Sequence, residues 1–495
     1  MTINVFCLNI YPLLIEIFLF IIICFCLLFS VILSNSVFYN FPLLLKSVNF
    51  FFLQTLFFSL LLLINSNPIF MIFFYDFLIC DSFNFYFKFL IIVFLIIWFF
   101  IFNQINKILN FEFKVLILLS ILSIFLLLQS YDLLIIYINI EFLSLTLYIL
   151  TSINKNSEFS TEAGLKYFIL GAFSSSLLLF GFVLLYSFTG LTNLQDLLIF
   201  FLSPALILKN NFNLIILTSL LFIFSSFLFK LGAAPFHYWL PDIYEGSATS
   251  ITAFFALIPK LAILNLIIRF YLITFFDFTY NDIYIFILIS ICLSSFVGTL
   301  GALVQTKWKR FISFSSVNHT SFFLLNFCTF NLNNLIIYLI IYLVMTSSFF
   351  SFFSSYSQVV FFTNTNNRFL TSLKFLNFLN PILAFSFTIL LFSLAGVPPL
   401  AGFFSKFFIL ISAISTKLFF LVFFMLILNC VSCFYYIFLI QKIYFINFEN
   451  IKLPIVTNFT NSNSLILGLL ISFIILNFLD FDLFFLIADL TCLSL

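Results

Sequence analysis

The stretch Phe229-Lys-Leu-Gly-Ala-Ala-Pro-Phe-His-Tyr-Trp-Leu-Pro-Asp-Ile-Tyr-Glu-Gly-Ser247, with Ile258-Pro-Lys260 shortly after it, decides how this chain folds. It places lysines, a histidine, two acids, glycines and prolines in a sequence that is otherwise almost entirely hydrocarbon. Only 7% of the 495 residues are charged, so the cluster stands out from its surroundings. The residues on either side of the cluster indicate the environment in which the chain folds.

The composition is that of a membrane protein. Hydrophobic residues make up 64% of the chain, whereas about a quarter of the residues in a soluble domain are charged. Runs of about 18 or more apolar residues recur, which is typical of transmembrane helices. The sequence therefore predicts an all-α polytopic membrane protein. Its basic loops are too sparse for nucleic-acid binding.

The apolar runs predict fourteen membrane spans. They lie near residues 10–33, 41–64, 84–103, 113–130, 132–153, 163–188, 213–245, 249–274, 283–304, 311–330, 334–359, 381–415, 418–446 and 464–486. A further apolar run at 69–80 is too short to cross and is expected at the interface. The spans group into helices 1–3 (1–110), a five-span block (111–274), a second five-span block (283–446) and a C-terminal loop with the fourteenth helix (447–495).

Basic residues gather in alternate loops, and the loops between them are rich in aspartate. By the positive-inside rule the basic loops face the matrix or the cytoplasm, and an even number of spans then puts both termini on the outer side. The basic loops contain Lys107, Lys114, Lys155, Lys307, Lys309, Arg310, Arg368, Lys374, Lys442 and Lys452.

Two predicted spans, 213–245 and 381–415, are longer than the roughly 20 residues that a bilayer needs. Each contains a helix breaker, because proline lacks an amide donor and clashes with the preceding turn. The breaks predict two discontinuous helices, 7 and 12, each beside a polar cavity. They lie five spans apart, which suggests two inverted five-helix repeats. The residues of the breaks are Gly232 and Pro235, and Gly396, Pro398 and Pro399.

Ionisable residues within the apolar spans are the candidate site. A charge at mid-depth costs about 2.5–3.5 kcal/mol on insertion scales, so such residues are rarely incidental. Glu16, near the outer end of the first span, is instead expected at the interface. The candidate residues are Glu141, Lys166, Lys230, Lys260, His319 and Lys406.

These residue types favour proton transfer. Burial disfavours the charged form of lysine and glutamate, so proton exchange becomes accessible near neutral pH. A row of such groups joined by water can pass protons along the middle of the membrane. The alternative is a set of static ion pairs that fix helix packing. Lys166, close to the inner end of its span, can also be a lysine whose ammonium extends to the interface.

No cofactor or metal is expected on this chain. Two histidines and distant acids do not form a metal-ligand set. Cys430 and Cys433 form a C-x-x-C pair without a second pair nearby, so an iron–sulfur cluster has little support.

Several motifs resemble subunit 2, the bacterial N-type subunit, of respiratory NADH dehydrogenase (complex I). The resemblance covers about residues 110–445 and is specific, because the motifs occur in the same order and at similar spacing. The motifs are Lys230–Gly246 with Pro259-Lys260, Glu162-Ala-Gly-Leu-Lys-Tyr-Phe168, Gly301-Ala-Leu-Val-Gln-Thr-Lys307, Lys309-Arg-Phe-Ile-Ser-Phe-Ser-Ser316 and Leu394-Ala-Gly-Val-Pro-Pro-Leu-Ala-Gly-Phe-Phe-Ser-Lys406.

The resemblance implies an antiporter-like proton-translocating subunit and a role for each candidate. Glu141 is then the coupling glutamate and Lys230 its partner on the broken helix. Lys260 is the central lysine and Lys406 the distal one. Two further candidates are the span-6 lysine, Lys166, and the span-10 histidine, His319.

The resemblance also implies an assembly. NADH, FMN, iron–sulfur clusters and ubiquinone belong to the assembled enzyme and none to this chain, which is a translocase subunit without a redox site. Its implied partners are membrane lipids, antiporter-like subunit 4 and the small subunits 4L and 6. The AT-biased composition favours a mitochondrial inner membrane of protist type, with a bacterial inner membrane as the alternative. A stand-alone cation/proton antiporter and a structural scaffold remain the other functional hypotheses.

Overall fold

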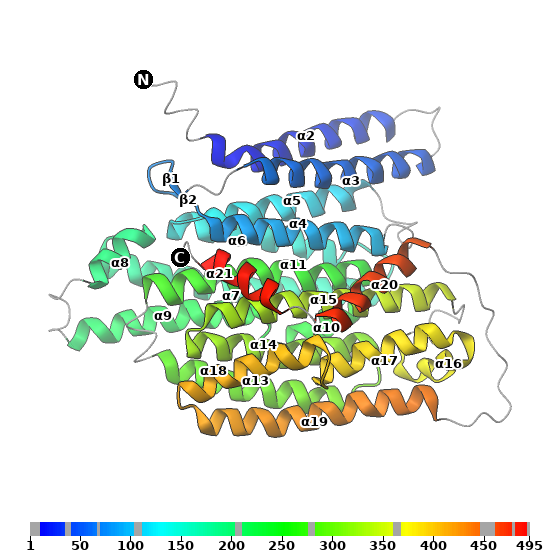
Figure 1. Ribbon diagram of the computed structural model, residues 1–495. Coiled ribbons are helices and arrows are strands. Elements are labelled where there is room, and N and C mark those ends of the chain that lie inside the picture. The colour runs from blue at the N-terminus through cyan, green and yellow to red at the C-terminus, as the bar shows by residue number, and fades with distance from the viewer. Residues whose placement is uncertain are drawn as a thin grey trace.

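The structure is a computed structural model that describes residues 10–34, 41–66, 70–102, 111–202, 210–275, 283–359, 368–445, 461–477 and 481–492. The described residues form a helical bundle with one short β-hairpin (Figure 1). The hydrocarbon core of a bilayer contains no water, so the backbone N–H and C=O groups of long apolar runs must hydrogen-bond to one another within helices. The all-α prediction is confirmed for the described membrane-spanning part of the chain.

The N-terminal helices form an outer layer. The short η1 (Tyr11–Leu13) leads into α2 (Leu14–Ser34), which packs against α3 (Phe41–Asn65) at the top of Figure 1. The short apolar run expected at the interface is an antiparallel hairpin of β1 (Met71–Phe73) and β2 (Leu78–Cys80), with Met71 opposite Cys80. The hairpin lies at one end of the bundle (Figure 1).

The middle of the chain supplies the first block of helices. Asp132 begins α6 by accepting a hydrogen bond from the Leu134 amide, as an N-cap residue does. The elements are α4 (Ser82–Phe102), α5 (Phe111–Gln129), α6 (Leu133–Thr151), α7 (Glu158–Thr189), α8 (Leu194–Leu202), α9 (Asn210–Leu231), α10 (Trp239–Gly246), α11 (Thr249–Ile268) and the π-helical turn η3 (Arg269–Thr274).

The second block follows. Asn380 caps α17 in the same way, accepting from the Leu383 amide. The elements are α13 (Tyr284–Val304), α14 (Trp308–Thr329), α15 (Leu332–Val359), the 3-10 turn η6 (Leu370–Phe375), α16 (Leu376–Leu379), α17 (Pro381–Ala395), α18 (Ala401–Ser415) and α19 (Phe419–Tyr444). The C-terminal helices are α20 (Asn461–Leu476) and α21 (Asp482–Cys492).

Eleven helices of the described residues are long and apolar enough to cross a membrane. Three predicted spans are not among them. The predicted span 311–330 is α14, whose serines, Asn318 and His319 make it more polar than the others. The predicted span 381–415 is divided into α17 and α18, and the predicted span 464–486 is two helices, α20 and α21, rather than one.

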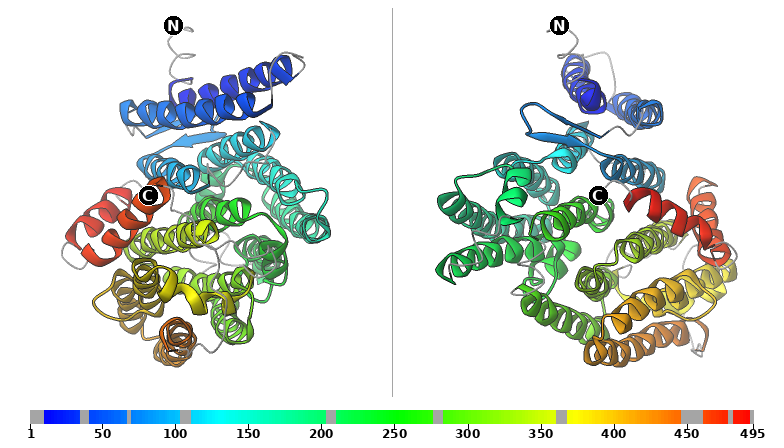
Figure 2. Two further views of the ribbon diagram at one scale, coloured as in Figure 1. Left: turned by 90° about the vertical axis from the view of Figure 1, so that its right-hand side faces the viewer. Right: turned by 60° about the vertical axis from the view of Figure 1, so that its left-hand side comes forward.

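Two helices form the centre of the bundle. The spanning part of α15 is completely buried, and that of α11 almost completely, whereas α2 and α19 are mostly exposed at the edges. Figure 2 shows α11 and α15 enclosed by the other helices when the bundle is viewed along its axes. Ionisable groups on α11 and its neighbours are therefore enclosed by protein and kept away from lipid.

Both predicted breaks are present. The first separates α9 from α10 and the second separates α17 from α18. Gly232 has φ +73° and Gly396 has φ +85°, a left-handed conformation that glycine adopts without strain. The Ala234–Pro235 and Pro398–Pro399 peptide bonds, three residues further on, are both cis.

Candidate functional site

The first break ends α9 in a complete Schellman motif. The Gly232 amide donates to the Phe229 carbonyl, and the Ala233 amide donates to the Leu228 carbonyl, both at 3.0 Å. The indole of Trp239, at the start of α10, also donates to the Phe229 carbonyl at 2.9 Å. The indole thus adds a second neutral donor to a carbonyl that the Schellman motif already pairs.

The second break ends α17 with the same backbone pattern. The Gly396 amide donates to the Ser393 carbonyl at 3.1 Å, and the Val397 amide donates to the Phe392 carbonyl at 3.0 Å. A Schellman motif leaves the last two carbonyls of a helix without a partner from its own backbone. These carbonyls need a donor from elsewhere.

Lys406 on α18 supplies that donor. Its ammonium donates to the Leu394 carbonyl at 2.8 Å, the Ala395 carbonyl at 3.2 Å and the side-chain oxygen of Asn429 at 2.9 Å. Lys406 is buried, and a cation is favoured at the C-terminal, negative end of a helix dipole. The thiol of Cys433 also donates to the Ala395 carbonyl. The C-x-x-C pair thus contributes one sulfur to the second break.

Lys260 and His319 are brought together by a pair of tyrosines on α15. The Lys260 ammonium donates to the Tyr342 hydroxyl at 3.2 Å, and the His319 ring lies 5.2 Å from the Tyr342 ring. The Nδ1 atom of His319 lies 2.7 Å from the Tyr338 hydroxyl. All four side chains are buried, and together they form the Lys260–His319 cluster.

The Lys260–His319 cluster has free capacity for proton exchange. The Nε2 atom of His319 is buried and has no hydrogen-bond partner among the described residues. A lysine, a histidine and two hydroxyl groups can each donate and accept protons in turn, so the cluster has the chemistry of a proton wire.

The predicted partners Glu141 and Lys230 are not in direct contact. Glu141, on α6, accepts a hydrogen bond from the Ser144 hydroxyl at 3.1 Å. Lys230, in the last turn of α9, is partly buried and has Glu141 as its charged neighbour. In the described part of the chain, no ion pair within 4.0 Å or hydrogen bond reaches the Lys230 ammonium. The predicted ion pair is therefore not formed in this structure.

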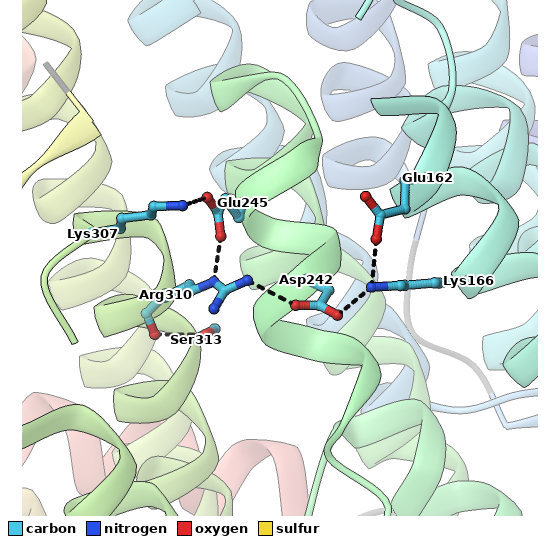
Figure 3. Close-up of polar contacts among 7 residues, drawn as sticks. All are labelled: Glu162, Lys166, Asp242, Glu245, Lys307, Arg310 and Ser313. Atoms are coloured by element: carbon cyan, nitrogen blue, oxygen red, sulfur yellow. Dashed lines mark hydrogen bonds and ion pairs between the residues drawn. The ribbon is translucent and has the colours of Figure 1, made fainter. Parts of the chain in front are cut away.

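Lys166 lies in a separate group of charges. Its ammonium is 2.8 Å from a carboxylate oxygen of Glu162 and 2.8 Å from one of Asp242, and its side chain is 43% exposed. A guanidinium nitrogen of Arg310 lies 3.1 Å from Asp242, so the pairs join into one network between α7, α10 and α14 (Figure 3). The structure therefore places Lys166 outside the Lys260–His319 cluster. The surface network consists of Glu162, Lys166, Asp242, Arg310, Glu245 and Lys307.

Comparison with known proteins identifies the family. Residues 130–432 match the family described as NADH:quinone oxidoreductase/Mrp antiporter, TM. NADH-ubiquinone oxidoreductase chain 2 of Marchantia polymorpha is 36% identical over 427 residues, which cover 85% of this chain and 85% of that protein. The chain belongs to the NADH:quinone oxidoreductase chain 2/subunit N family.

Further relatives and solved structures support membership of the chain 2/subunit N family. NADH-quinone oxidoreductase subunit N of Pelagibacter ubique is 39% identical over 348 residues, covering 69% of this chain and 70% of that protein. A chain of respiratory complex I from Thermus thermophilus superposes with a TM-score of 0.73 at 26% identity, covering 92% of this chain and 97% of that one. A chain of the Mrp complex from Dietzia sp. shares the fold, with a TM-score of 0.81 at 16% identity, covering 98% and 97%.

The N-terminal helices of this family member contain buried ion pairs that the sequence did not predict. Glu16, in the first turn of α2, is paired with Lys88 on α4, and both side chains are buried, a partnership that the sequence analysis did not predict. Arg269 donates to Asp81 at 2.6 Å and to Asn84 at 2.8 Å. Each acid is stabilised inside the bundle by a partner from a different helix, which hydropathy alone cannot reveal.

The assignment of Lys114 also differs in the same region. Lys114, assigned to a basic loop, is buried in α5 over the rings of Phe52 and Phe99, at 5.1 and 4.8 Å. Aromatic faces can hold an ammonium group that has no acid nearby. Cys80 lies in the hairpin, outside the spans, and burial raises the pKa of its thiol, so it stays protonated.

The residues that complete the site come mostly from α15 and α19. Tyr338 and Tyr342 are four residues apart and so lie on one helix face, which is a signal that the sequence contains. Asn429, which accepts a hydrogen bond from Lys406, lies in an apolar span, and no spacing in the sequence points to it. Its role follows only from the packing of α19 against α17 and α18.

Proposed function

We propose that the chain is the proton-translocating, antiporter-like subunit of an NADH:quinone oxidoreductase. Protons cross the membrane through buried lysine, histidine, tyrosine and water groups, driven by NADH oxidation and quinone reduction in other subunits. The observation that carries this proposal is the Lys260–His319 cluster, a hydrogen-bonded set of titratable side chains at the enclosed centre of the bundle. Ionisable residues inside transmembrane segments are costly, and they usually mark a functional site.

In the proposed path, Lys260 is the central proton store. Its ammonium gives a proton to water or, through the Tyr342 hydroxyl, towards His319, and it becomes neutral in doing so. His319 takes the proton on its unpartnered Nε2 atom and passes it towards Lys406. Lys406 first releases its own proton, losing part of its hold on the end of α17, and as a neutral amine it then accepts the proton from His319. Each transfer moves one proton and leaves the donor neutral.

Glu141 and Lys230 form the coupling end of this path. Because they are not paired in this structure, a change in charge on Lys260 can favour or disfavour their contact. Closing the pair stabilises the charge on Lys230, and opening it releases a proton. Lys166 takes part through the surface network, at the inner end of the path.

The same proposal includes the topology and the assembly. Two inverted five-helix repeats within a chain of fourteen spans are part of the proposal, and the matching Schellman motifs at the two breaks support the repeats. The chain has no redox site of its own. It lies in an inner membrane, mitochondrial or bacterial, beside antiporter-like subunit 4 and the small subunits 4L and 6, with lipids around it.

A direct test replaces Lys260 by alanine in an assembled complex and measures NADH-driven acidification of membrane vesicles. Pumping is expected to fall about a hundredfold, the scale of a lost acid–base group, with the complex still assembled. Tyr342→Phe tests the link to His319 and is expected to slow pumping while keeping the ring. Tyr356→Phe is the matched control on α15, because that hydroxyl donates to the Ser372 carbonyl instead.

Each alternative function gives a different result. A stand-alone cation/proton antiporter would purify alone and exchange cations without NADH. If the chain is only a structural scaffold, the Lys260→Ala complex should pump at the wild-type rate and lose only stability. Unchanged pumping by an assembled Lys260→Ala complex would therefore contradict the proposal.

A further inference from the structure

A second polar cavity, of about 280 Å³, lies at the end of the bundle where α7, α11 and α14 begin. The basic-loop assignment puts this end of the helices at the inner face of the membrane. The cavity is separate from the Lys260–His319 cluster. Its lining includes Phe159, Thr249, Lys307, Trp308, Lys309 and Arg368.

The cavity has an excess of positive charge. Its lining holds three cations and one carboxylate, Glu245, which is already paired with Lys307 in the cavity and with Arg310 outside it. Lys309 and Arg368 have no carboxylate partner among the described residues. The charge of Arg368 acts unfavourably on Lys309, and the opposite charge of Glu245, which also acts on Lys309, is shared with Lys307 and Arg310, so a bound anion stabilises the two cations.

Both cations keep free donors. Lys309 uses one of its three ammonium protons for the Ser247 carbonyl, at 2.5 Å. Arg368 lies with its guanidinium 5.3 Å from the Phe159 ring, and it offers a planar fork that suits phosphate oxygens. The pair can therefore supply several hydrogen bonds to one anion.

The three helices that begin at this cavity add to its positive potential. The side chains of the residues before their first turns, Ser157, Ala248 and Lys307, accept no hydrogen bond from the backbone amides of these turns. Their amide ends remain partly positive, and three such ends favour an anion at the point where they meet. This effect supports the cation pair and does not replace it.

Two aromatic side chains stand among the small and polar residues of the remaining wall. Phe159 and Trp308 line the cavity beside the cations, and aromatic side chains of this kind are typical of the level of lipid headgroups. A cavity with a cationic floor and aromatic walls at the inner interface suits a phosphate group carried by an amphipathic molecule. Basic pockets between membrane helices bind anionic headgroups in this way.

We propose that the cavity binds a phosphate group, supplied by an anionic lipid of the inner leaflet or by a soluble phosphate compound. Lys309 and Arg368 bind the phosphate oxygens, and Phe159 and Trp308 contact the adjoining carbon chain. The bound group holds together the inner ends of α7, α11 and α14. Two of these helices carry Lys260 and His319, so occupancy fixes the spacing of the central cluster.

The test uses the purified full chain and native mass spectrometry. The chain is mixed with equal amounts of phosphatidylglycerol and phosphatidylcholine, and the retained lipid is counted. The wild-type chain is expected to prefer phosphatidylglycerol, and Lys309→Gln/Arg368→Gln is expected to lose about thirtyfold of that preference, the effect of two surface cations. Lys309→Arg/Arg368→Lys keeps the charge and should keep binding, which separates a lost site from a misfolded protein.

A matched control removes two cations at the same end but outside the cavity. Lys374→Gln/Lys442→Gln lowers the net charge equally and is expected to retain the preference. An excess of inorganic phosphate distinguishes the two sources. Displacement of the lipid indicates a site for soluble phosphate compounds, and retention indicates a headgroup site, so both agree with the proposal. Equal binding of the two lipids, or unchanged binding by Lys309→Gln/Arg368→Gln, overturns it.

Discussion

The two breaks have the same backbone and different chemistry. Both end a helix in a Schellman motif with glycine in the left-handed region, Gly232 in one and Gly396 in the other. In the first, the extra donor at the end of the helix is the neutral indole of Trp239. In the second, it is the ammonium of Lys406. The indole bonds a carbonyl that the Schellman motif already pairs, whereas the ammonium bonds the last two carbonyls of α17 and can lose a proton.

Positions at equal distance from the two glycines show the same contrast. Six residues on, Tyr238 is 77% exposed in the first break, while Gly402 is packed against the end of α17 in the second. Ten residues on, Asp242 lies in the partly exposed surface network, while Lys406 is buried. A shared backbone design therefore fixes where a helix stops, and side chains decide whether that stop can respond to a proton.

The largest expected effect is at Gly402. A methyl group there would lie 1.8 Å from the Ser393 carbonyl oxygen, and neither backbone can move far. Gly402→Ala should lower the free energy of unfolding by about 3 kcal/mol or more, as overpacking does. Thermal unfolding of the purified chain measures this. Tyr238→Ala, at the counterpart position, should change it by less than about 0.5 kcal/mol. Equal stability of the two variants would contradict the comparison.

The next effect is at Lys406. Lys406→Met keeps the length of the side chain but removes the donor from the Leu394 and Ala395 carbonyls and from Asn429. Pumping should fall about a hundredfold, and stability by about 2 kcal/mol, because buried acceptors are left unpaired. Vesicle acidification and thermal unfolding check the two parts. Lys406→Arg should restore stability more fully than it restores pumping. Normal pumping by the Lys406→Met complex would show that the Lys406 ammonium is only structural.

A smaller effect is expected at Trp239. Trp239→Phe removes one hydrogen bond to the Phe229 carbonyl and should cost about 1–2 kcal/mol. Amide hydrogen exchange around Gly232 should speed up, because the end of α9 opens more often. Trp98→Phe loses a similar bond, to the Ser250 carbonyl, away from both breaks. If both variants speed exchange at Gly232 alike, the indole is not a specific part of the first break.

The smallest effect is expected at Asp242. Asp242→Asn weakens its pairs with Lys166 and Arg310, which are partly exposed, so the loss of stability should be about 1 kcal/mol or less. Raising the salt concentration should reduce the difference from wild type, because exposed pairs are screened. A large, salt-independent loss would mean that this network is as buried as Lys406.

The sequence predicted the breaks and the buried lysines because glycine, proline and charge are rare in an apolar chain. It did not predict their partners. Lys260 meets Tyr342 on α15, and Lys406 meets carbonyls and Asn429, none of which a charge pattern reveals. The expected Glu141–Lys230 pair is open, since distance between two helices is set by packing.

By itself, the sequence determined that the chain folds in a membrane, that it is helical, and where two of its helices end. Hydropathy, helix length and the conformational limits of glycine and proline are local properties, so they can be read along the chain. Only the tertiary structure decided that Glu16 is buried against Lys88, that Lys166 belongs to a surface network, and that the two breaks differ in their donors. Those outcomes depend on which side chains meet across helices far apart in sequence.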